Sequence, residues 1–357
     1  MTTADSDEAP VLLRTHGHAG HLVLNRPRAI NALNHTMVRL MDDALKEWGR
    51  DDDIATVVLT GAGERGLCAG GDIRSIHDDI RAGGGAASVA FWRDEYRLNA
   101  RIARFPKPYV AVMDGIVMGG GVGLSAHGSV RIVTERSRIA MPETGIGFVP
   151  DVGGTYLLTR TPGELGTHLA LTGSAVGAGD ALLCGLADHY VPSERLPEFT
   201  AALAGADAGE VVAEYAAAAP EGELAAHREW IDACYRADSV EEIVDRLYHS
   251  GDPAAKETAE TILGKSPTSL KVTLAALRRA RDLASLEQVL DQEYRVSATA
   301  ITAPDMVEGI RAQVVDKDRH PHWSPAELTH VTDAQVARHF ARRDGDELGL
   351  ATGTDPR

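Results

Sequence analysis

Two acidic residues near the middle of the chain, Glu143 and Asp151, are candidates for general acid and base chemistry. They flank the apolar stretch at residues 145–148. If the two carboxyls share a pocket, burial and mutual repulsion raise the pKa of one of them, which suits proton transfer near neutral pH. Without other context, the pattern favours Asp151 as a helix N-cap over Gly153 and Gly154, and Glu143 as a solvated turn acid. The residues alone leave both interpretations open.

Two glycine-rich loops form a second group of candidates. Residues 69–72 read Ala-Gly-Gly-Asp, and residues 118–123 read Met-Gly-Gly-Gly-Val-Gly. Adjacent glycines allow backbone angles that other residues avoid, and they let a ligand approach the main-chain N–H groups closely. At the start of a helix, such unpaired N–H groups carry partial positive charge and suit a developing oxyanion. Each loop taken alone is more often a place of close packing.

A third glycine pattern, at residues 61–66, matches the dinucleotide fingerprint G-x-G-x-x-G after an apolar run. That fingerprint requires a helix directly after its last glycine, whereas residues 67–71 read Leu-Cys-Ala-Gly-Gly. Asp78 and Asp79 stand near the distance expected for the acid that binds the ribose, but Asp78 lies in a helical context rather than at a strand end. The pattern therefore favours an ordinary turn over a nicotinamide site.

Short strands and amphipathic helices alternate in the first part of the chain. Apolar runs predict strands near residues 21–24, 56–60, 109–113 and 130–133. Apolar residues at steps of three and four predict a helix over residues 37–48, with Asn34 as its N-cap. A second helix is expected over residues 88–104. This alternation predicts an α/β core.

The second part of the chain has a different character. Strand signals almost vanish after Ala201, and apolar residues recur at helical spacing over residues 270–284 and 286–295. We therefore expect a mostly helical region. The polar tail from Asp344 is expected to fray.

Composition excludes several classes of function. The chain has 357 residues with 44% hydrophobic residues and a formal net charge of -16, which repels nucleic acid. No apolar run approaches the roughly 20 residues that cross a membrane, and the acidic N-terminal residues lack an apolar signal segment, so a cytoplasmic location is expected. The three cysteines are far apart and form no CxxC pair, which argues against a zinc site and favours buried thiols.

Four collinear segments resemble the enoyl-CoA hydratase/isomerase, or crotonase, superfamily. They read NRPRAINALN at 25–34, LCAGGDIR at 67–74, KPYVAVMDGIVMGGGVGLSAHG at 107–128 and MPETGIGFVPDVGG at 141–154. The resemblance implies an α/β fold with a crotonase-like spiral of ββα turns over residues 11–200 that binds acyl-CoA. A helical C-terminal domain over 201–343 and a flexible tail over 344–357 are expected to follow.

The resemblance also implies roles for particular residues. The N–H groups of Gly71 and Gly120 would hold the thioester carbonyl, and the segment containing Arg26 and Ala29 would lie along the CoA nucleotide. No metal or redox cofactor is implied, because coenzyme A enters as part of the substrate. Crotonase relatives form trimers and hexamers, which leaves a homo-oligomer open for this chain.

One position departs from the hydratases of the superfamily. Those enzymes carry one catalytic glutamate in a GGG-x-E motif and another in a later P-E motif, whereas here the first is Gly123 and only Glu143 is present. Addition of water to an enoyl-CoA by the two-acid route therefore lacks one of its two catalytic acids. The chain resembles more closely the branch of 3-hydroxyisobutyryl-CoA hydrolases of valine breakdown. The matching segments are RDEYRLN at 93–99, SPTSLKVT at 266–273, EYRVS at 293–297 and EGIRAQVVDKDRHPHWSP at 308–325.

By this resemblance the substrate site contains Glu95, Gly120, Glu143 and Asp151. The implied activity is hydrolysis of a short-chain 3-hydroxyacyl-CoA thioester, above all 3-hydroxyisobutyryl-CoA, with Glu143 as nucleophile or general base. Asp151 or Glu95 would orient the 3-hydroxyl group or the water. An enoyl-CoA isomerase or hydratase is the alternative, followed by a nicotinamide enzyme or a binding module without activity.

Overall fold

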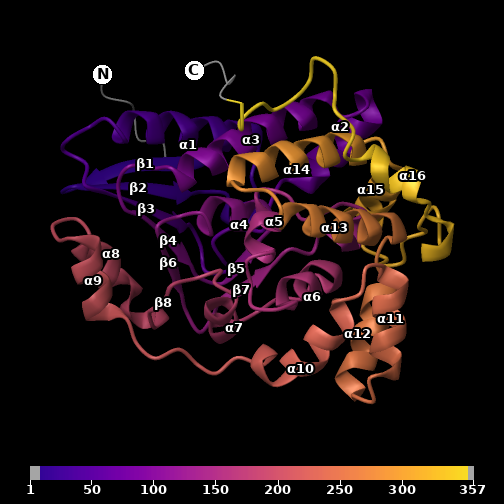
Figure 1. Cartoon of the computed structure of the whole chain (residues 1–357). Helices are drawn as coiled ribbons and strands as arrows, with labels where there is room; N and C mark the ends of the chain where they lie inside the picture. The colour runs from indigo at the N-terminus through magenta and orange to yellow at the C-terminus, as the bar shows by residue number, and fades with distance from the viewer. Residues whose placement is uncertain (1–8, 353–357) are drawn as a thin grey trace. The chain divides into compact units, whose positions relative to one another are not determined.

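A computed structural model of the chain, drawn in Figure 1, describes residues 9–352. Its contacts divide the chain into two compact units. Unit 1 takes residues 1–71, 97–139 and 176–222, and unit 2 takes residues 72–96, 140–175 and 223–357. Each unit thus collects segments that are far apart in the sequence. The predicted boundaries at residues 200 and 343 follow the chain order instead, and they stay a prediction.

Unit 1 is built on a six-stranded sheet with the strand order β1-β2-β3-β4-β6-β8. The strands are β1 (Val11–His16), β2 (Ala19–Leu24), β3 (Thr56–Gly61), β4 (Tyr109–Met113), β6 (Val130–Val133) and β8 (His189–Tyr190). Only β1 and β2 pair antiparallel, and every other neighbouring pair is parallel. A second, two-stranded sheet contains β5 (Ile116–Met118) and β7 (Arg138–Ala140).

The parallel strands are apolar because such a sheet is covered on both faces. Val58, Val110 and Ile132 contribute one residue from each of three neighbouring strands to a common buried cluster. Phe199 and Val211, from the helices α8 and α9 described below, complete that cluster. The central strands are therefore held by side chains that come from much later in the sequence.

One ββα turn carries the second glycine loop. The chain runs along β4 in the large sheet, then along β5 in the small sheet, and then into the helix α4 (Gly120–Ser125). The segment at residues 66–70 lies beside β5, because the N–H of Cys68 donates to the carbonyl of Ile116 at 3.1 Å and the N–H of Met118 donates to the carbonyl of Cys68 at 2.9 Å. These bonds bring both glycine loops to one end of β5.

The helix α1 (His35–Trp48) packs directly against the sheet. The side chain of Asn34 accepts the N–H of Met37 at 3.0 Å, which is the predicted N-cap. A Cβ at Gly20 of β2 would lie only 2.7 Å from the Trp48 ring, so the close approach of helix and strand requires glycine there. The predicted helix and its cap are confirmed.

The remaining helices of unit 1 are short. They are η1 (Pro27–Ala29), α7 (Ala178–Leu183), η3 (Ser193–Arg195), α8 (Leu196–Ala202) and α9 (Ala208–Tyr215).

Unit 2 is helical. Its elements are α2 (Ile73–Gly83), the first part of α3 (Ala86–Ala103), η2 (Glu143–Ile146), α5 (Gly154–Leu158), α6 (Leu165–Thr172), α10 (Leu224–Tyr235), α11 (Val240–His249), α12 (Pro253–Leu263), α13 (Pro267–Ala280), α14 (Leu286–Ala300), α15 (Pro304–Ile310), the π-helix η4 (Arg311–Val315), η5 (Leu328–His330) and α16 (Asp333–Arg338).

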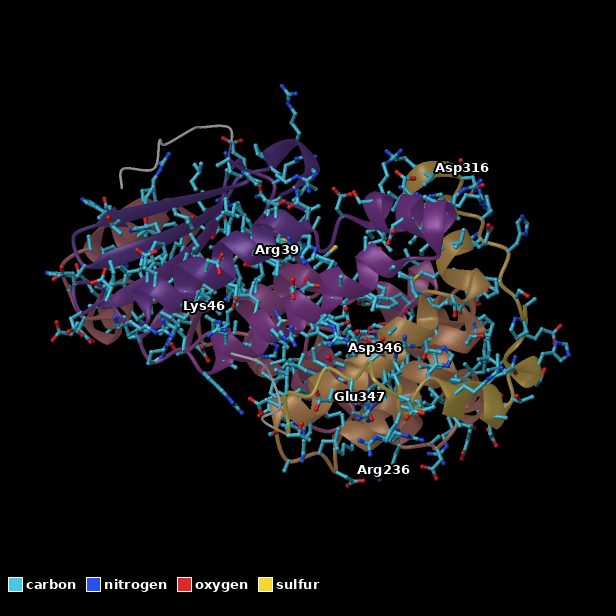
Figure 2. All side chains as sticks on the ribbon, turned by 90° about the horizontal axis from the view of Figure 1, so that it is seen from above. Arg39, Lys46, Arg236, Asp316, Asp346 and Glu347 are labelled. Carbon is cyan, nitrogen blue, oxygen red and sulfur yellow. The ribbon has the colours of Figure 1, made fainter. Side chains whose placement is uncertain are left out.

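The last described residues of unit 2 are tied to its helices. Asp346 accepts a hydrogen bond from Arg93 of α3, and Glu347 accepts one at 2.7 Å from Nε of Arg295 of α14; both acids are labelled in Figure 2. The predicted flexible tail over residues 344–357 stays a prediction, since its final part, residues 353–357, lies outside the described residues.

The predicted fold class is confirmed: an α/β arrangement with a mostly parallel sheet precedes a helical region, and no strand follows β8 in the part of the chain that the structure describes. The four predicted strands correspond to β2, β3, β4 and β6. Cys68, Cys184 and Cys234 are all buried free thiols, as expected. Within residues 9–352, no helix combines the length and the apolar character that crossing a membrane requires.

Candidate active site

The two glycine loops of unit 1 lie against each other. Gly119 adopts φ 49° and ψ -120°, and Gly70 has φ 99°, both conformations that strongly favour glycine. A Cβ at Gly70 would lie 3.1 Å from the carbonyl oxygen of Met118 and 3.6 Å from the nitrogen of Gly120. The loop that carries Gly71 therefore runs directly beside the start of α4.

The N–H groups of Gly71 and Gly120 are available to a ligand. Gly120 is the first residue of α4, so its N–H precedes the first hydrogen bond of the helix. Within the described residues, no backbone carbonyl accepts the N–H of Gly71 or of Gly120. Two such donors on neighbouring loops are what a carbonyl oxygen that gains negative charge requires.

The segment around Arg26 and Ala29 also belongs to unit 1, where the buried side chain of Asn31 organises it. The Asn31 amide donates to the carbonyls of Ala62 and Leu67 at 3.0 and 3.1 Å, and its oxygen accepts the N–H of Arg26 at 2.9 Å. This fixes a turn in which Asn31 itself has φ 54°. The N–H of Ala69 donates to the carbonyl of Ile30 at 2.9 Å, so the turn that carries Arg26 and Ala29 is also bonded to the first glycine loop.

Unit 2 collects the candidate acids. Glu95 lies on α3, Glu143 opens η2, and Asp151 lies in the loop between η2 and α5. Their exposed fractions are 2%, 6% and 5%, respectively. The two plainer interpretations are therefore wrong: Glu143 is buried rather than solvated, and the N-cap of α5 is Gly153 without a side-chain cap, rather than Asp151.

These three carboxyls influence one another's ionisation. Burial raises the pKa of Glu143 well above its ordinary value, and the negative charges of Asp151 and Glu293 raise it further. Burial does the same to the pKa of Glu95, helped by Asp151 and Glu143. Burial raises the pKa of Asp151 to about 7, although a hydrogen bond from Tyr96 opposes that shift. The cluster therefore holds protons near neutral pH and is suited to acid and base chemistry.

Two oxygens of the cluster have no hydrogen-bond partner among the described residues. They are Oε1 of Glu95 and Oε2 of Glu143, both fully buried. An unpartnered carboxyl oxygen in the interior costs free energy unless a ligand or water satisfies it. The two side chains are therefore arranged for a partner that the protein itself does not supply.

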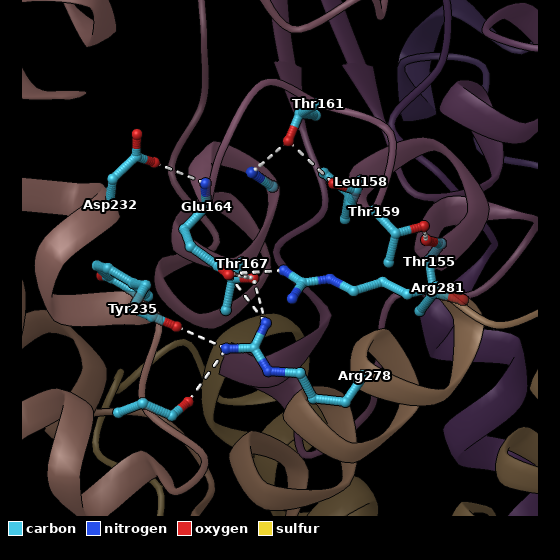
Figure 3. A network of polar contacts seen from close by, with 12 residues as sticks. Thr155, Leu158, Thr159, Thr161, Glu164, Thr167, Asp232, Tyr235, Arg278 and Arg281 are labelled. Carbon is cyan, nitrogen blue, oxygen red and sulfur yellow. Dashed lines mark hydrogen bonds and ion pairs between the residues drawn. The ribbon is translucent and has the colours of Figure 1, made fainter. Parts of the chain in front are cut away.

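Another buried carboxyl of unit 2, that of Glu164, has a structural role and serves as a comparison. Glu164 accepts hydrogen bonds from Arg278, Arg281 and Thr167 at 2.9, 2.8 and 2.6 Å (Figure 3). Burial alone would raise the pKa of Glu164, but these bonds outweigh it and hold the pKa below its ordinary value. No ion pair reaches Glu95 or Glu143 in the described part of the chain, so they differ from Glu164 in kind.

The structure adds three residues to the cluster that sequence reasoning missed as functional. Tyr96 donates to Asp151 at 2.6 Å and lies 2.7 Å from the hydroxyl of Ser297, and Glu293 accepts the N–H of Gly153 at 2.6 Å. The available signal was the pair of segments at 93–99 and 293–297, which carried the family resemblance but were assigned no side-chain contacts.

The predicted residues thus fall into two groups. Unit 2 brings together Glu95, Glu143 and Asp151, and unit 1 brings Gly71 beside Gly120. Their roles stay predictions.

A sequence model of a known family matches most of the chain. The model of the enoyl-CoA hydratase/isomerase family matches residues 19–340. The chain is 42% identical to the mitochondrial 3-hydroxyisobutyryl-CoA hydrolase of Rattus norvegicus, over 94% of this chain and 89% of that protein. It is 40% identical to the protein of the same name from Homo sapiens, over 95% of this chain and 90% of that protein.

Two solved structures share the whole fold. A carnitinyl-CoA dehydratase from Mycobacterium thermoresistibile is 52% identical with a TM-score of 0.93, covering 96% of this chain and 98% of that one. An enoyl-CoA hydratase from Rhodobacter sphaeroides 2.4.1 is 43% identical with a TM-score of 0.90, covering 95% and 99%. These similarities establish the crotonase fold for this chain.

Proposed function

Because the chain belongs to the enoyl-CoA hydratase/isomerase family, we propose that it hydrolyses the thioester of a short-chain 3-hydroxyacyl-CoA, with 3-hydroxyisobutyryl-CoA as its substrate in valine breakdown. The relatives that carry this hydrolase name support the proposal over nearly their full length. The observation that carries it is the buried Glu143 with an unpartnered oxygen, combined with a glycine at position 123, where the hydratase motif has its other acid.

In the proposed mechanism, the thioester carbonyl accepts hydrogen bonds from the N–H groups of Gly71 and Gly120. Attack on the carbonyl carbon moves charge onto the oxygen, and preoriented donors stabilise that charge more in the transition state than in the substrate. Loss of one such donor typically lowers kcat about 100-fold to 1,000-fold. The contact between the two loops supports this assignment.

Glu143 supplies the attack in one of two ways. As a nucleophile, its carboxylate adds to the carbonyl carbon, the C–S bond breaks, and CoA leaves as a thiolate that takes up a proton. Water then opens the acyl anhydride and restores the carboxyl. As a general base, Glu143 instead accepts a proton from water, and the resulting hydroxide attacks the same carbon. The unpartnered oxygen of Glu143 is compatible with both routes.

The other acids hold the substrate in this proposal. Asp151 or Glu95 orients the 3-hydroxyl group of the acyl chain or the hydrolytic water, and the turn with Arg26 and Ala29 lies along the CoA nucleotide. The proposed steps use no redox cofactor, because no atom changes its oxidation state, and they use no metal, because the two N–H donors polarise the carbonyl. A cytoplasmic location and a homo-oligomer stay predictions.

A thiol-release assay tests the proposal. The purified protein is mixed with 3-hydroxyisobutyryl-CoA, 3-hydroxypropionyl-CoA or crotonyl-CoA, and free thiol and absorbance of the enoyl thioester are followed together. Rapid thiol release from the 3-hydroxyacyl esters, without hydration of crotonyl-CoA, is expected. Absence of thiol release from every ester would exclude hydrolysis.

The second candidate is a hydratase or dehydratase of an acyl-CoA. It is favoured by the names of the two full-length structural neighbours. In that case two of the buried acids of unit 2 would share the proton transfers that a GGG-x-E glutamate performs elsewhere. The same assay separates the candidates, because hydration changes the enoyl absorbance and releases no thiol.

A further inference from the structure

The hydroxyl of Tyr96 lies at the centre of the acid cluster in unit 2. Its side chain is completely buried, with an exposed fraction of 0%, and it follows Glu95 directly on α3. The hydroxyl donates to Oδ2 of Asp151 at 2.6 Å and lies 2.7 Å from Oγ of Ser297 on α14. Neither Tyr96 nor Ser297 takes part in the bond changes of the proposed reaction.

The donor and the acceptor in these two hydrogen bonds are fixed because the Tyr96 hydroxyl has only one proton to donate. A phenol has one proton, and Tyr96 gives it to Asp151. The hydroxyl of Ser297 must then donate to the oxygen of Tyr96. The result is a directed chain from Ser297 through Tyr96 to Asp151, in which each bond polarises the next.

Within the described residues, Asp151 is the only one of the three candidate acids that receives such a side-chain donor. Glu95 and Glu143 each keep one oxygen without any partner. A hydrogen bond to a carboxylate stabilises its ionised form. Burial of a carboxyl oxygen without a donor destabilises the ionised form and favours the protonated one. The geometry thus distinguishes chemically similar acids that lie in one buried cluster.

The surrounding groups make this distinction necessary. Negative charge on Asp151 raises the pKa of three neighbouring acids, Glu95 of α3, Glu143 of η2 and Glu293 of α14. No cation forms an ion pair with Asp151 in the part of the chain that the structure describes. Several buried like charges cannot all be ionised at once. A single donor of fixed direction therefore decides where the first charge goes.

We propose that Tyr96, held by Ser297, is a positioning residue that directs the first negative charge of the acid cluster onto Asp151. Once Asp151 is ionised, its charge raises the pKa of Glu143 and of Glu95, so Glu143 gives up its proton and becomes the attacking group only after Asp151 has been ionised. Without the phenol, the first ionisation of the cluster occurs at higher pH and no longer at a defined carboxyl. The consequence for catalysis rests on the proposed hydrolase function, but the consequence for titration does not.

The test compares Tyr96→Phe with Tyr294→Phe. Tyr294 is equally buried and its ring packs edge-to-face on Tyr96 at 6.4 Å, but its hydroxyl donates to Asp346, outside the acid cluster. Both variants lose one hydroxyl and keep the ring. In Tyr96→Phe, the acidic limb of the pH profile of kcat/KM is expected to move up by about one to two pH units, the effect of one lost charge-assisted hydrogen bond. In Tyr294→Phe it should not move.

A second measurement needs no activity. The difference in Tm between the unmodified protein and Tyr96→Phe should widen as the pH rises from about 6 to 9, because the lost bond stabilises only the ionised form of Asp151. The difference for Tyr294→Phe should stay constant, since the pKa of Asp346 lies below its ordinary value and this carboxyl is ionised throughout. Absence of thiol release in the unmodified protein would reject the proposed function and leave this titration test intact.

Ser297→Ala provides an independent variant. This substitution keeps the hydrogen bond from Tyr96 to Asp151 but removes the Ser297 hydroxyl that donates to Tyr96. The acidic limb of the pH profile of kcat/KM should therefore move up, by less than in Tyr96→Phe. If the acidic limbs and the Tm differences of Tyr96→Phe and Ser297→Ala both match those of Tyr294→Phe, the proposal is wrong.

Discussion

Glu293 accepts, at 2.6 Å, the N–H of Gly153, two residues after Asp151. The same carboxylate accepts the N–H and the hydroxyl of Thr155 at 2.9 and 2.6 Å. The turn between them is unusual, because Val152 has φ 54° and Gly153 has φ 79°, and a β-branched residue rarely adopts that conformation. Glu293 therefore stabilises a strained turn that fixes the direction of Asp151.

Glu293→Gln is expected to lower both Tm and kcat. The amide keeps one acceptor oxygen but turns an NH₂ group toward an N–H donor, so at least one bond is lost in a fully buried place. We expect a loss of about 2–4 kcal/mol in the free energy of unfolding, measured by chemical denaturation. Glu260→Gln, on an exposed position of α12, is the control and should change neither quantity. Unchanged stability in Glu293→Gln would show that the turn holds without the carboxylate.

Glu143→Gln is expected to remove turnover without loss of stability. The substitution removes the attacking or proton-accepting group, which lowers kcat by about 100-fold to 10,000-fold. Tm should stay equal or rise, because the buried oxygen of Glu143 has no partner to lose. Retained binding of a CoA ester is checked by calorimetry, and near-normal thiol release would end the assignment.

Glu164→Gln is expected to lower stability and to leave turnover unchanged, the reverse of Glu143→Gln. This acid bonds Arg278 and Arg281, as Figure 3 shows, so the substitution leaves two guanidinium groups with weaker partners. We expect a loss of about 1–3 kcal/mol in the free energy of unfolding, since the arginines are partly exposed. Turnover per folded molecule should be unchanged. If Glu164→Gln abolished turnover at full stability, the separation of structural and functional acids would be incorrect.

Gly70→Ala is expected to damage the proposed oxyanion site. A Cβ at φ 99° is strained, and at 3.1 Å it would press on the carbonyl oxygen of Met118, two residues before the donor Gly120. Displacement of one donor should lower kcat by about 100-fold or more, with a smaller change in KM. Gly84→Ala is a matched control, because Gly84 also has positive φ, 79°, but no atom lies within 4 Å of its added Cβ. It should cost stability and leave kcat intact.

The stability of the protein is expected to fall as the pH rises through neutrality. Burial raises the pKa of Asp151 to about 7 and that of Glu293 to about 8, from ordinary values of 3.8 and 4.5. Between those limits the folded protein binds more protons than the unfolded chain, so each unit of pH lowers the free energy of unfolding. Chemical denaturation between about pH 5 and 9 measures the slope. A flat profile would mean that these carboxyls ionise normally in the folded protein.

Local patterns predicted the elements that have strong periodicity and clear ends. The strands at 56–60 and 109–113 are short apolar runs, and the helix from His35 is set by its apolar spacing and by the Asn34 cap. Sequence spacing also located both glycine loops. It could not assign the burial of Glu143 or Asp151, because the same residue types in the same pattern fit a solvated turn and a helix cap.

The sequence by itself determined the alternation of strands and helices, the helical second half and the family, because periodicity, caps and motif spacing are local properties. Only the tertiary structure decided that the acids are buried and which side chains from distant segments bond to them. Tyr96 and Ser297 are 201 residues apart in the chain, yet their hydroxyls lie 2.7 Å apart. Ionisation depends on burial and on charges from other segments, and no local pattern encodes those.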